Sequence, residues 1–352
     1  MKLLDLFNTP TCLNDKIRPP YIIAEAGVNH EGDMNAARRL IDEAVEGGAH
    51  AIKFQTYKAN TIASKDSPTY WDITKEPTES QYKLFQQYDK FWKEEYEQLK
   101  ICCDQAGIEF MSTPFDVESA KFLNDMMDVF KISSSDITNK PFIEFICDFG
   151  KPIILSTGAS YLHEIQEAVE WISAKQVPVA LLHCILNYPT DDQNAHLGMI
   201  KDLQQKFPDK TIGYSDHTLP NNMKVLEVAT LLGAAIIEKH FTYDKSLPGN
   251  DHYHAMDKED LIVFNKKLDK MFAILGNQRK YPLRTENSAR NNARRSLVAA
   301  MNICEGTIIS REHLTWKRPA HGISPRHIEE VLGKQAGRDI AEDEVLQWNV
   351  LN

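Results

Sequence analysis

Short apolar runs that end in polar clusters recur along the first three quarters of the chain, and they constrain its fold more than any other feature. The runs lie at 21–24, 51–54, 108–111, 129–132, 153–155, 179–182, 211–214 and 235–237. A near-continuous apolar strand is typical of a parallel sheet that is covered by helices on both faces. The runs therefore predict eight buried strands.

Segments with helical periodicity separate several of these runs. The apolar residues between Ala37 and Val45 repeat every 3.6 residues, and Gly48 predicts the end of that helix. Similar patterns predict helices over 118–126, 163–172 and 223–232. Eight strands alternating with helices predict an α/β fold, a (β/α)₈ TIM barrel, with an open doubly wound sheet as the alternative.

Charge, hydropathy and cysteine usage narrow the class of protein. The chain has 352 residues, and 40 basic against 50 acidic side chains give a net charge of −10, which argues against a nucleic-acid partner. No apolar stretch of about 18 residues is present, and the opening segment lacks the pattern of a secretory signal, so we expect no membrane association. The cysteines have no metal-binding spacing, which predicts reduced thiols and a cytoplasmic protein. They are Cys12, Cys102, Cys103, Cys147, Cys184 and Cys304.

Two segments depart from the strand–helix alternation. Residues 60–88 form a long polar and aromatic connection after a strand, so we expect a lid or a subunit contact over the barrel mouth. Residues 277–292 are polar and aperiodic, which predicts a linker between a barrel at 1–276 and a small domain at 293–352. In that domain the pattern predicts strands at 296–301 and 314–317 and a helix at 326–332. Such a small module has little core of its own, so we expect it to dock onto another surface.

Two lysines stand inside apolar strands. Lysine is almost never buried without a partner, so Lys53 and Lys131 predict either an anion site or structural ion pairs. Hydroxyl clusters at 112–113, 133–135 and 156–157 follow neighbouring strands and would surround such an anion.

Two histidines end the last two predicted strands. His217 and His240, with Asp216 and Glu238 beside them, predict a metal site, although a single histidine is more often structural. Two imidazoles leave open positions, which suits Mn²⁺, Fe²⁺ or Co²⁺ better than a closed structural Zn²⁺ site. Asp251 lies in the turn-rich segment that follows, where we weigh contact with a substrate against a solvated turn.

Motifs in the order found along the chain resemble those of the sialic acid synthases, which condense phosphoenolpyruvate with an N-acylmannosamine. They are IAEAGVNHEG, IKFQTYKA, STPFD, FKISSSD, PIILSTG, LLHC with YPT, IGYSDHT and IEKHFT. The segments RRSLVAA and WKRPAHGISP resemble the antifreeze-like SAF domain of the same family, a β-clip fold.

The resemblance implies roles for individual residues. Lys53, Thr113, Lys131, Ser134 and Ser156 match the positions that hold phosphoenolpyruvate, and His217 and His240 match the ligands of a divalent metal, Mn²⁺ first, with Mg²⁺ or Co²⁺ as alternatives. Glu25 matches a residue near the reacting aldehyde. The positions that match sugar-binding residues are Gln55, Asp136, Tyr188, Asp251 and Arg318. The resemblance also implies a homodimer in which the SAF domain carries Arg318 to the partner's site.

Three positions depart from the family pattern and leave the acceptor sugar open. Asp136 stands where Glu is common, Leu186 replaces a small or polar residue, and His321 interrupts the usual glycine-rich loop. The acceptor is therefore expected to be N-acetylmannosamine or a related N-acyl hexosamine. The alternatives are the diacetamido-trideoxy hexose of legionaminic or pseudaminic acid synthases, and an acceptor that already carries a phosphate. A non-catalytic carbohydrate-binding protein is a distant alternative.

Overall fold

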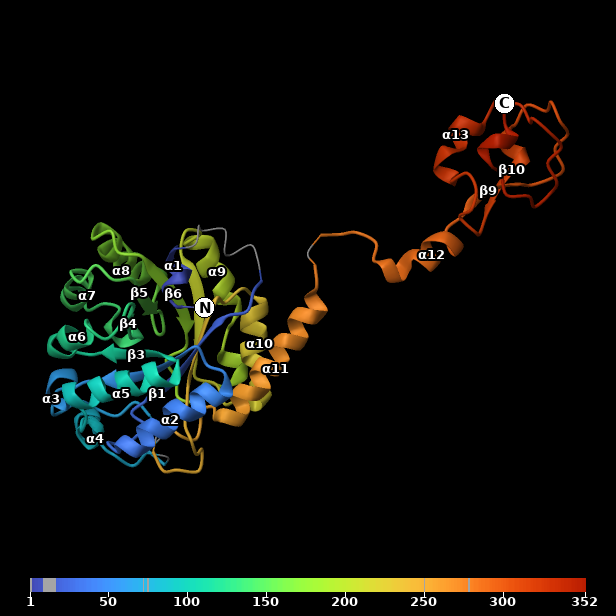
Figure 1. Cartoon of the computed structure of the whole chain (residues 1–352). Coiled ribbons are helices and arrows are strands. Elements are labelled where there is room, and N and C mark those ends of the chain that lie inside the picture. The colour runs from blue at the N-terminus through green and yellow to red at the C-terminus, as the bar shows by residue number, and fades with distance from the viewer. Residues whose placement is uncertain (1, 9–16, 72, 75, 250, 278) are drawn as a thin grey trace. The chain divides into compact units, whose positions relative to one another are not determined.

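The computed structural model describes residues 2–8, 17–71, 73–74, 76–249, 251–277 and 279–352. They belong to two compact units, Met1–Leu275 and Gly276–Asn352 (Figure 1). Cys12 lies outside the described residues, and the other cysteines are free thiols.

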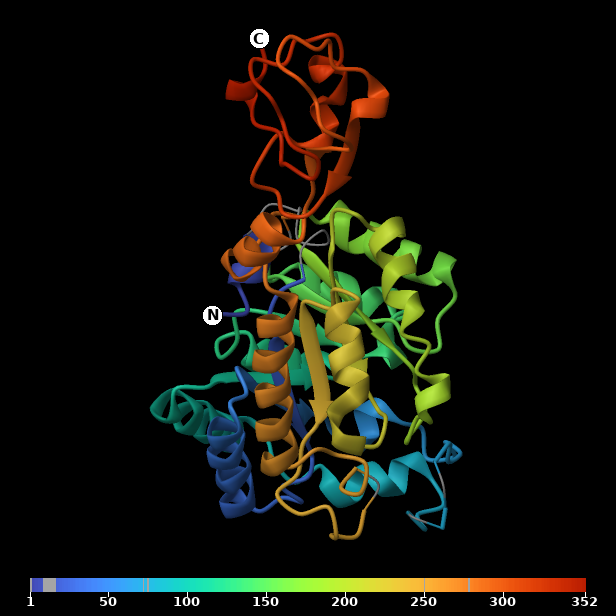
Figure 2. The same ribbon diagram turned by 90° about the vertical axis from the view of Figure 1, so that its right-hand side faces the viewer.

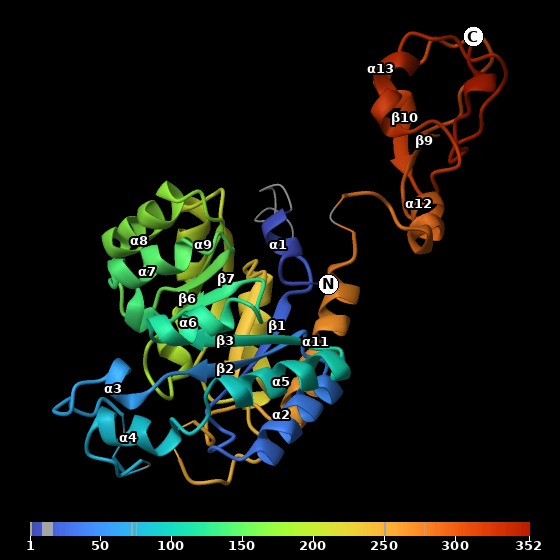
Figure 3. The same cartoon turned by 60° about the vertical axis from the view of Figure 1, so that its left-hand side comes forward.

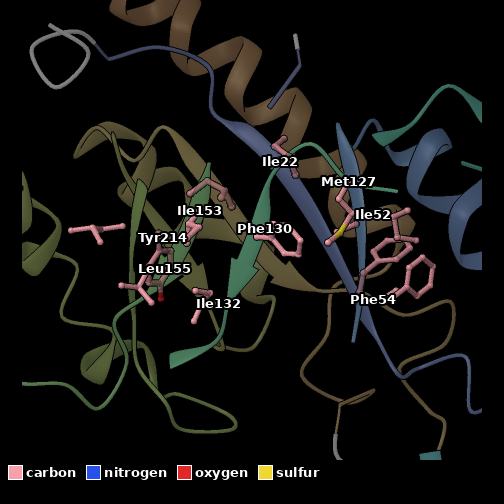
Figure 4. Close-up of a cluster of buried hydrophobic side chains, with 14 of the residues drawn as sticks. Ile22, Ile52, Phe54, Met127, Phe130, Ile132, Ile153, Leu155 and Tyr214 are labelled. Carbon is pink, nitrogen blue, oxygen red and sulfur yellow. The ribbon is translucent and has the colours of Figure 1, made fainter. Parts of the chain in front are cut away.

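Each predicted apolar run forms one strand of an eight-stranded parallel sheet in the first unit. The strands are β1 (Tyr21–Gly27), β2 (Ala51–Thr56), β3 (Glu109–Pro114), β4 (Phe130–Ile132), β5 (Ile153–Ser156), β6 (Val179–Cys184), β7 (Thr211–Asp216) and β8 (Ile236–His240). Every residue of β1 is buried, because alternate side chains face the barrel interior and the surrounding helices. Figure 4 shows part of the layer that packs against the helices, with Ile22, Ile52 and Phe130 among its members.

The strand order closes the sheet into a barrel. The order is β3-β2-β1-β8-β7-β6-β5-β4, so that the first strand pairs with the last, from Tyr21↔Ile236 to Glu25↔His240. Strands β3 and β4 lie in contact and complete the ring, which excludes the open doubly wound sheet. Within the described residues no backbone ladder joins these two strands, and we call their contact the seam. At the seam the Ser112 N–H donates to Met127 Sδ at 3.0 Å.

Helices cover the outside of the barrel (Figure 3). They are α2 (Met34–Gly47), α5 (Lys93–Ala106), α6 (Val117–Leu123), α7 (Lys140–Cys147), α8 (Leu162–Ala174), α9 (Gly198–Lys206), α10 (Lys224–Leu231) and α11 (Lys258–Leu275), with short 3₁₀ turns at η1 (Ser134–Asp136), η2 (Asp192–Asn194) and η3 (Asn221–Met223). Asp33 caps the start of α2 by accepting from the N–H groups of Asn35 and Ala36, and Gly48 ends it at a φ of 86°. The predicted helix over 118–126 ends earlier, at Leu123, because the chain turns there to enter β4. None of the helices in the described part of the chain is long and apolar enough to cross a bilayer.

A short N-terminal segment forms the floor of the barrel. Leu3 and Leu6, the latter in α1 (Asp5–Asn8), pack with inward-facing Tyr21, Ile23 and Ile236. The Leu3 N–H donates to Glu109 Oε1 at 3.1 Å and fixes the segment to the start of β3. This floor lies at the opposite end of the barrel from the polar strand ends.

The long connection after β2, residues 60–88, lies over the barrel mouth as expected, and we call it the lid. It contains α3 (Ala59–Ile62), a bridge between Pro68 and Ser80, and α4 (Gln81–Tyr88). The Ser80 hydroxyl caps α4 by accepting from the Lys83 N–H at 3.3 Å. The lid and the loop after β8 lie at the same end of the barrel (Figures 1 and 2).

The second unit has little regular structure. Its elements are η4 (Arg284–Glu286), α12 (Asn287–Asn292), β9 (Ser296–Ala299), η5 (Arg311–His313), β10 (Leu314–Lys317), η6 (Pro325–His327), α13 (Ile328–Val331) and η7 (Trp348–Val350). Strands β9 and β10 pair antiparallel, and isolated bridges such as Ile303↔Ile340 tie the loops to one another.

The structure refines two expectations for this unit and contradicts a third. The predicted linker is helical in its second half, because Glu286 accepts from the Leu283 N–H at 2.7 Å and starts the helical turns there. The helix predicted over 326–332 is present as a 3₁₀ turn that starts at Pro325 and continues into the single turn α13, with Ser324 as its N-cap and Gly333 at a φ of 83° after it. The unit also buries a core of its own, which includes Leu297, Ile309 and Leu346, so it does not need to dock in order to bury apolar surface.

Candidate active site

Two cavities lie at the carboxyl ends of the strands. The inner cavity, of about 50 Å³, is lined by residues from all eight strands or the turns that follow them. The outer cavity, of about 420 Å³, lies between these strand ends, the lid and the loop after β8. Both cavities have walls in common, formed by Gln55, Phe115, Ser133, Leu186, Tyr188 and His240.

Lys53 and Lys131 face the inner cavity from β2 and β4, and both are almost fully buried. The Lys53 ammonium contacts Glu25 Oε2 and donates to Thr113 Oγ1 at 2.9 Å. The Lys131 ammonium donates to Ser156 Oγ at 2.7 Å. Burial lowers the pKa of Lys131 despite the carboxylates nearby.

Glu238 is the carboxylate that the two lysines share. Its Oε2 lies 3.8 Å from Lys53 Nζ, and its Oε1 lies 3.9 Å from Lys131 Nζ and accepts from Ser215 Oγ at 3.0 Å. Burial by itself would raise the pKa of Glu238, but the two ammonium groups outweigh it and lower the pKa. The two lysines therefore form ion pairs, and these ion pairs lie inside a cavity at the strand ends, where an anion could also reach them.

Glu25 is the register partner of Lys53 in the pairing of β1 with β2, and its carboxylate contacts both Lys53 and Gln55. Gln55 Nε2 donates to Glu25 Oε1 at 3.0 Å. Burial raises the pKa of Glu25 to about 7 even though Lys53 opposes the shift. Glu25 is therefore a carboxyl group that can gain or lose a proton near neutral pH.

The hydroxyl groups predicted to surround an anion line the inner cavity as well. Thr113 and Ser156 are both bonded to the buried lysines. Ser134 lies in η1, directly after β4, and its Oγ accepts from the Gly158 N–H at 2.9 Å. The cavity thus combines two cations with several hydroxyl donors, which is a suitable environment for a phosphate or carboxylate group.

His217 and His240 stand side by side at the ends of β7 and β8, with ring centres 5.4 Å apart. His217 Nδ1 lies 2.8 Å from the Ile185 carbonyl, so this nitrogen carries the proton and Nε2 keeps its lone pair. Burial lowers the pKa of His217 to about 4 and that of His240 well below its usual value, so both rings are neutral. His240 Nδ1 is buried without a hydrogen-bond partner.

These two imidazoles fit a divalent cation. Neutral imidazole is the form that ligates metal, and the Ile185 carbonyl fixes the tautomer of His217 in the way that outer-shell partners do. No group of three or more histidine, cysteine or carboxylate side chains converges as a metal cluster in the described residues. Two protein ligands with the other positions left to water or substrate are typical of a catalytic site rather than a structural one.

Tyr188 and Asp251 contact the two histidines and also line the outer cavity. The Tyr188 ring packs on His217 with centres 4.1 Å apart. Asp251 Oδ2 lies 3.8 Å from His240 Nδ1, and its Oδ1 lies 3.5 Å from Nε2 of buried His254. The loop after β8 therefore belongs to the site, which rules out the solvated turn considered for Asp251.

The structure brings the predicted barrel residues together at the two cavities. Asp136 lines the outer cavity, where burial raises its pKa. The others at the two cavities are Glu25, Lys53, Gln55, Thr113, Lys131, Ser134, Ser156, Tyr188, His217, His240 and Asp251. Arg318 belongs to the second unit, where it is exposed. His30, in the first of the family motifs, is buried in a stack on Phe91.

The carboxylates beside the histidines have partners that the sequence reasoning missed. Asp216 and Lys239 form a buried ion pair at 2.7 Å outside both cavities. Glu238 instead forms ion pairs with Lys53 and Lys131. The alternation of side chains along each strand could have predicted these partners. Ser215 and Glu238 share the inward face with the histidines, whereas Asp216 and Lys239 point to the other face.

Comparison with known proteins identifies the class to which this fold and site belong. Residues 40–280 match the NeuB family and residues 294–352 match the SAF domain. The chain therefore belongs to the NeuB family and has a SAF domain after its barrel, as the motifs predicted.

Individual relatives span nearly the whole chain. It is 39% identical to the N,N'-diacetyllegionaminic acid synthase of Campylobacter jejuni, over 93% of this chain and 98% of that protein. It is 30% identical to the N-acetylneuraminate-9-phosphate synthase of Homo sapiens, over 95% of this chain and 93% of that protein. The crystal structure of the N-acetylneuraminic acid (sialic acid) synthetase of Leptospira borgpetersenii, in complex with citrate, has a TM-score of 0.68 and 35% identity and covers 77% of this chain and 90% of that chain.

Proposed function

We propose that this protein condenses phosphoenolpyruvate with an N-acyl hexosamine, N-acetylmannosamine or a related sugar, to form a nine-carbon 2-keto-3-deoxy acid and phosphate. The observation that carries the proposal is the inner cavity, where two buried lysines and three hydroxyls stand beside two neutral imidazoles. The names of the relatives above support the same class of reaction.

Phosphoenolpyruvate would take the inner cavity because its charge requires the two lysines. At about 50 Å³ this space holds only a few water molecules. Binding therefore requires the anion to displace Glu25 from Lys53, after which Thr113, Ser134 and Ser156 supply hydroxyl donors.

A divalent metal, Mn²⁺ first and Mg²⁺ or Co²⁺ as alternatives, would be held by His217 and His240. When bound, it supplies a Lewis acid for the carbonyl oxygen of the acceptor. Asp251 would keep the His240 ring in place from the other side, across the 3.8 Å gap between its Oδ2 and Nδ1.

The protein's own groups would carry the protons. As C3 of phosphoenolpyruvate attacks the acceptor aldehyde, Glu25 gives its proton to the aldehyde oxygen. Water then adds at C2 and gives a proton back to Glu25. Phosphate leaves by cleavage of the C2–O bond and takes the proton of the new C2 hydroxyl, so that the keto group forms. A carboxyl group whose pKa is about 7 suits both halves of this cycle.

Phosphate release tests the proposal against a non-catalytic sugar-binding protein. Purified protein with Mn²⁺, phosphoenolpyruvate and N-acetylmannosamine or a diacetamido-trideoxy hexose should release one phosphate for each nine-carbon acid formed. EDTA should stop the reaction and added Mn²⁺ should restore it. His217→Ala should be inactive with an unchanged circular dichroism spectrum, whereas His163→Ala, at an exposed position, should keep full activity. Sugar binding without phosphate release would contradict the proposal.

We also propose a homodimer in which the SAF domain of one chain completes the site of the other. The resemblance supports this arrangement, and Arg318 is an exposed arginine whose planar fork suits an amide or carboxylate. The domain buries a core of its own, so its small size does not by itself require it to dock on a partner.

A further inference from the structure

A third histidine lies behind the two that are proposed to hold the metal. His254 is fully buried, and its ring packs edge-on against His240 with ring centres 5.1 Å apart. It is absent from the described lining of both cavities, so a substrate bound in them would not touch it. Any effect of His254 on the reaction would therefore pass through its neighbours.

Neither nitrogen of the His254 ring has a hydrogen-bond partner among the described residues. Its Nε2 lies 3.5 Å from Asp251 Oδ1, which is too long for a hydrogen bond of ordinary length. Its other neighbours include the rings of Tyr188 and Tyr253. A phenyl ring would fill the same space without burying two unpaired nitrogens, so packing alone does not explain an imidazole at this position.

Asp251 lies between the rings of His254 and His240. Its Oδ1 faces His254 Nε2, and its Oδ2 lies 3.8 Å from His240 Nδ1, which is also buried without a hydrogen bond in the described part of the chain. Burial by itself would raise the pKa of Asp251, but the two imidazoles outweigh it and lower the pKa. Asp251 is therefore an ionised acceptor that can take one N–H from each ring.

The backbone holds His254 beside His240 independently of Asp251. Two residues further on, the Met256 N–H donates to the His240 carbonyl at 2.8 Å, and the Met256 carbonyl accepts from the Thr242 N–H at 2.9 Å. The chain next to His254 is thus fixed to the end of β8. His254 is a suitable anchor for a carboxylate that also faces the outer cavity.

The two proposed metal ligands differ in what fixes their rings. His217 Nδ1 lies 2.8 Å from the Ile185 carbonyl, whereas the acceptor that faces His240 Nδ1 is Asp251, across 3.8 Å. A hydrogen bond to one nitrogen of a ligand ring fixes the tautomer that leaves the lone pair on the other nitrogen. His240 gains that bond when Asp251 keeps its Oδ2 directed at Nδ1.

We infer that His254 is a positioning residue for the metal site. Its Nε2–H bonds Asp251 Oδ1, and this bond directs Oδ2 to His240 Nδ1, so that His240 Nε2 keeps its lone pair for the cation. Small rotations of the three side chains bring both contacts to about 3 Å. The inference rests on the proposed function, because it assumes that His217 and His240 hold the divalent cation.

The test is Mn²⁺ binding to the EDTA-treated full chain, measured by isothermal titration calorimetry without substrates. We expect His254→Phe to raise the Kd for Mn²⁺ roughly 10-fold, the lower end of the loss that follows removal of an outer partner of a metal ligand. The KM for phosphoenolpyruvate at saturating Mn²⁺ should not change, because His254 does not line the inner cavity. The Tm should not fall, since the substitution breaks no hydrogen bond of the imidazole.

Two amide variants separate hydrogen bonding from packing. Glutamine places an N–H donor close to the position of histidine Nε2, whereas asparagine places it close to that of Nδ1. We expect His254→Gln to restore a Kd for Mn²⁺ close to that of the wild type, and His254→Asn to bind Mn²⁺ as weakly as His254→Phe. Unfolded protein lowers the stoichiometry of the titration rather than the Kd, so the comparison holds even if a variant is less stable.

His183→Phe is the matched control. His183 is also buried and absent from the described lining of both cavities, but its Nε2 lies 2.8 Å from the Ala195 carbonyl. This variant should lower the Tm and leave the Kd for Mn²⁺ unchanged. An unchanged Kd in His254→Phe, or an equal rise in His183→Phe, overturns the inference and leaves the proposed function standing if phosphate is still released. A wild type that neither binds Mn²⁺ nor releases phosphate overturns both.

Discussion

The buried ion pair of Asp216 and Lys239 should contribute more to the stability of the barrel than any exposed pair of equal length. Both side chains are only 1% exposed, and their charged atoms lie 2.7 Å apart. Asp216→Asn keeps the shape of the side chain but leaves the Lys239 ammonium buried with the Thr218 carbonyl as its remaining partner. Breaking a buried pair in this way costs about 3–5 kcal/mol. For a domain of this size that corresponds to a fall in Tm of about 6–20 °C.

The assay is thermal unfolding of the full chain followed by circular dichroism, with a matched exposed pair as the control. Lys175 and Asp148 are also 2.7 Å apart, but their side chains are 42% and 61% exposed. Asp148→Asn should leave Tm unchanged, because water solvates the lysine that remains. Equal shifts in the two variants would refute the reasoning that burial sets the cost.

The pH dependence of the same variant has a definite sign. Burial by itself would raise the pKa of Asp216, but Lys239 outweighs it and lowers the pKa below the unfolded value of about 3.9. The contribution of the carboxylate is therefore present above about pH 4 and is lost as the pH falls through the lower pKa of the folded state. The difference in stability between the wild type and Asp216→Asn should be constant from about pH 6 to 8 and shrink in acid.

Other predictions concern the inner cavity, the SAF domain and the floor of the barrel. Lys53→Met and Lys131→Met should each raise the KM for phosphoenolpyruvate roughly 10- to 150-fold, because each removes one charge-assisted contact. The KM for the sugar should change little. An unchanged KM for phosphoenolpyruvate would mean that the lysines have a purely structural role. Arg318→Ala subunits mixed with His217→Ala subunits should regain activity after exchange, and no recovery would mean that Arg318 acts in its own chain's site or not at all. Leu6→Ala should lower the free energy of unfolding by about 2–5 kcal/mol in denaturant titrations without changing KM, because Leu6 lies at the opposite end from the site.

The barrel and most of the site were predictable because each rests on a pattern that the sequence expresses directly. Strands buried on both faces appear as apolar runs, and parallel strands bring their carboxyl ends together, so Lys53, Lys131 and the two histidines had to meet. The partners of Asp216 and Glu238 depend on which face each residue takes. That choice follows from strand alternation and from the register that places Asp216 opposite Lys239.

The second unit was harder to predict because its core does not come from periodic elements. Ile303 and Ile340 are bridged across a large separation in sequence, and neither lies in a strand or helix of the unit. Residues of this kind show neither the repeat of a helix nor that of a strand, so the sequence suggested a module with little core. The helical half of the linker had a local signal, the Leu283–Glu286 cap, but no apolar repeat to support it.

The seam between β3 and β4 gives the substrate a second role. Thr113 lies next to the last residue of β3 and Lys131 lies in β4, and both line the inner cavity. Phosphoenolpyruvate bound to both would be a removable cross-link that holds the barrel shut where backbone hydrogen bonds do not. At a concentration 100 times its Kd such a ligand adds about 2.7 kcal/mol to stability. Amide hydrogen exchange in β3 and β4 should then slow more than in β6 and β7, so that the enzyme at work is a more rigid molecule than the enzyme at rest.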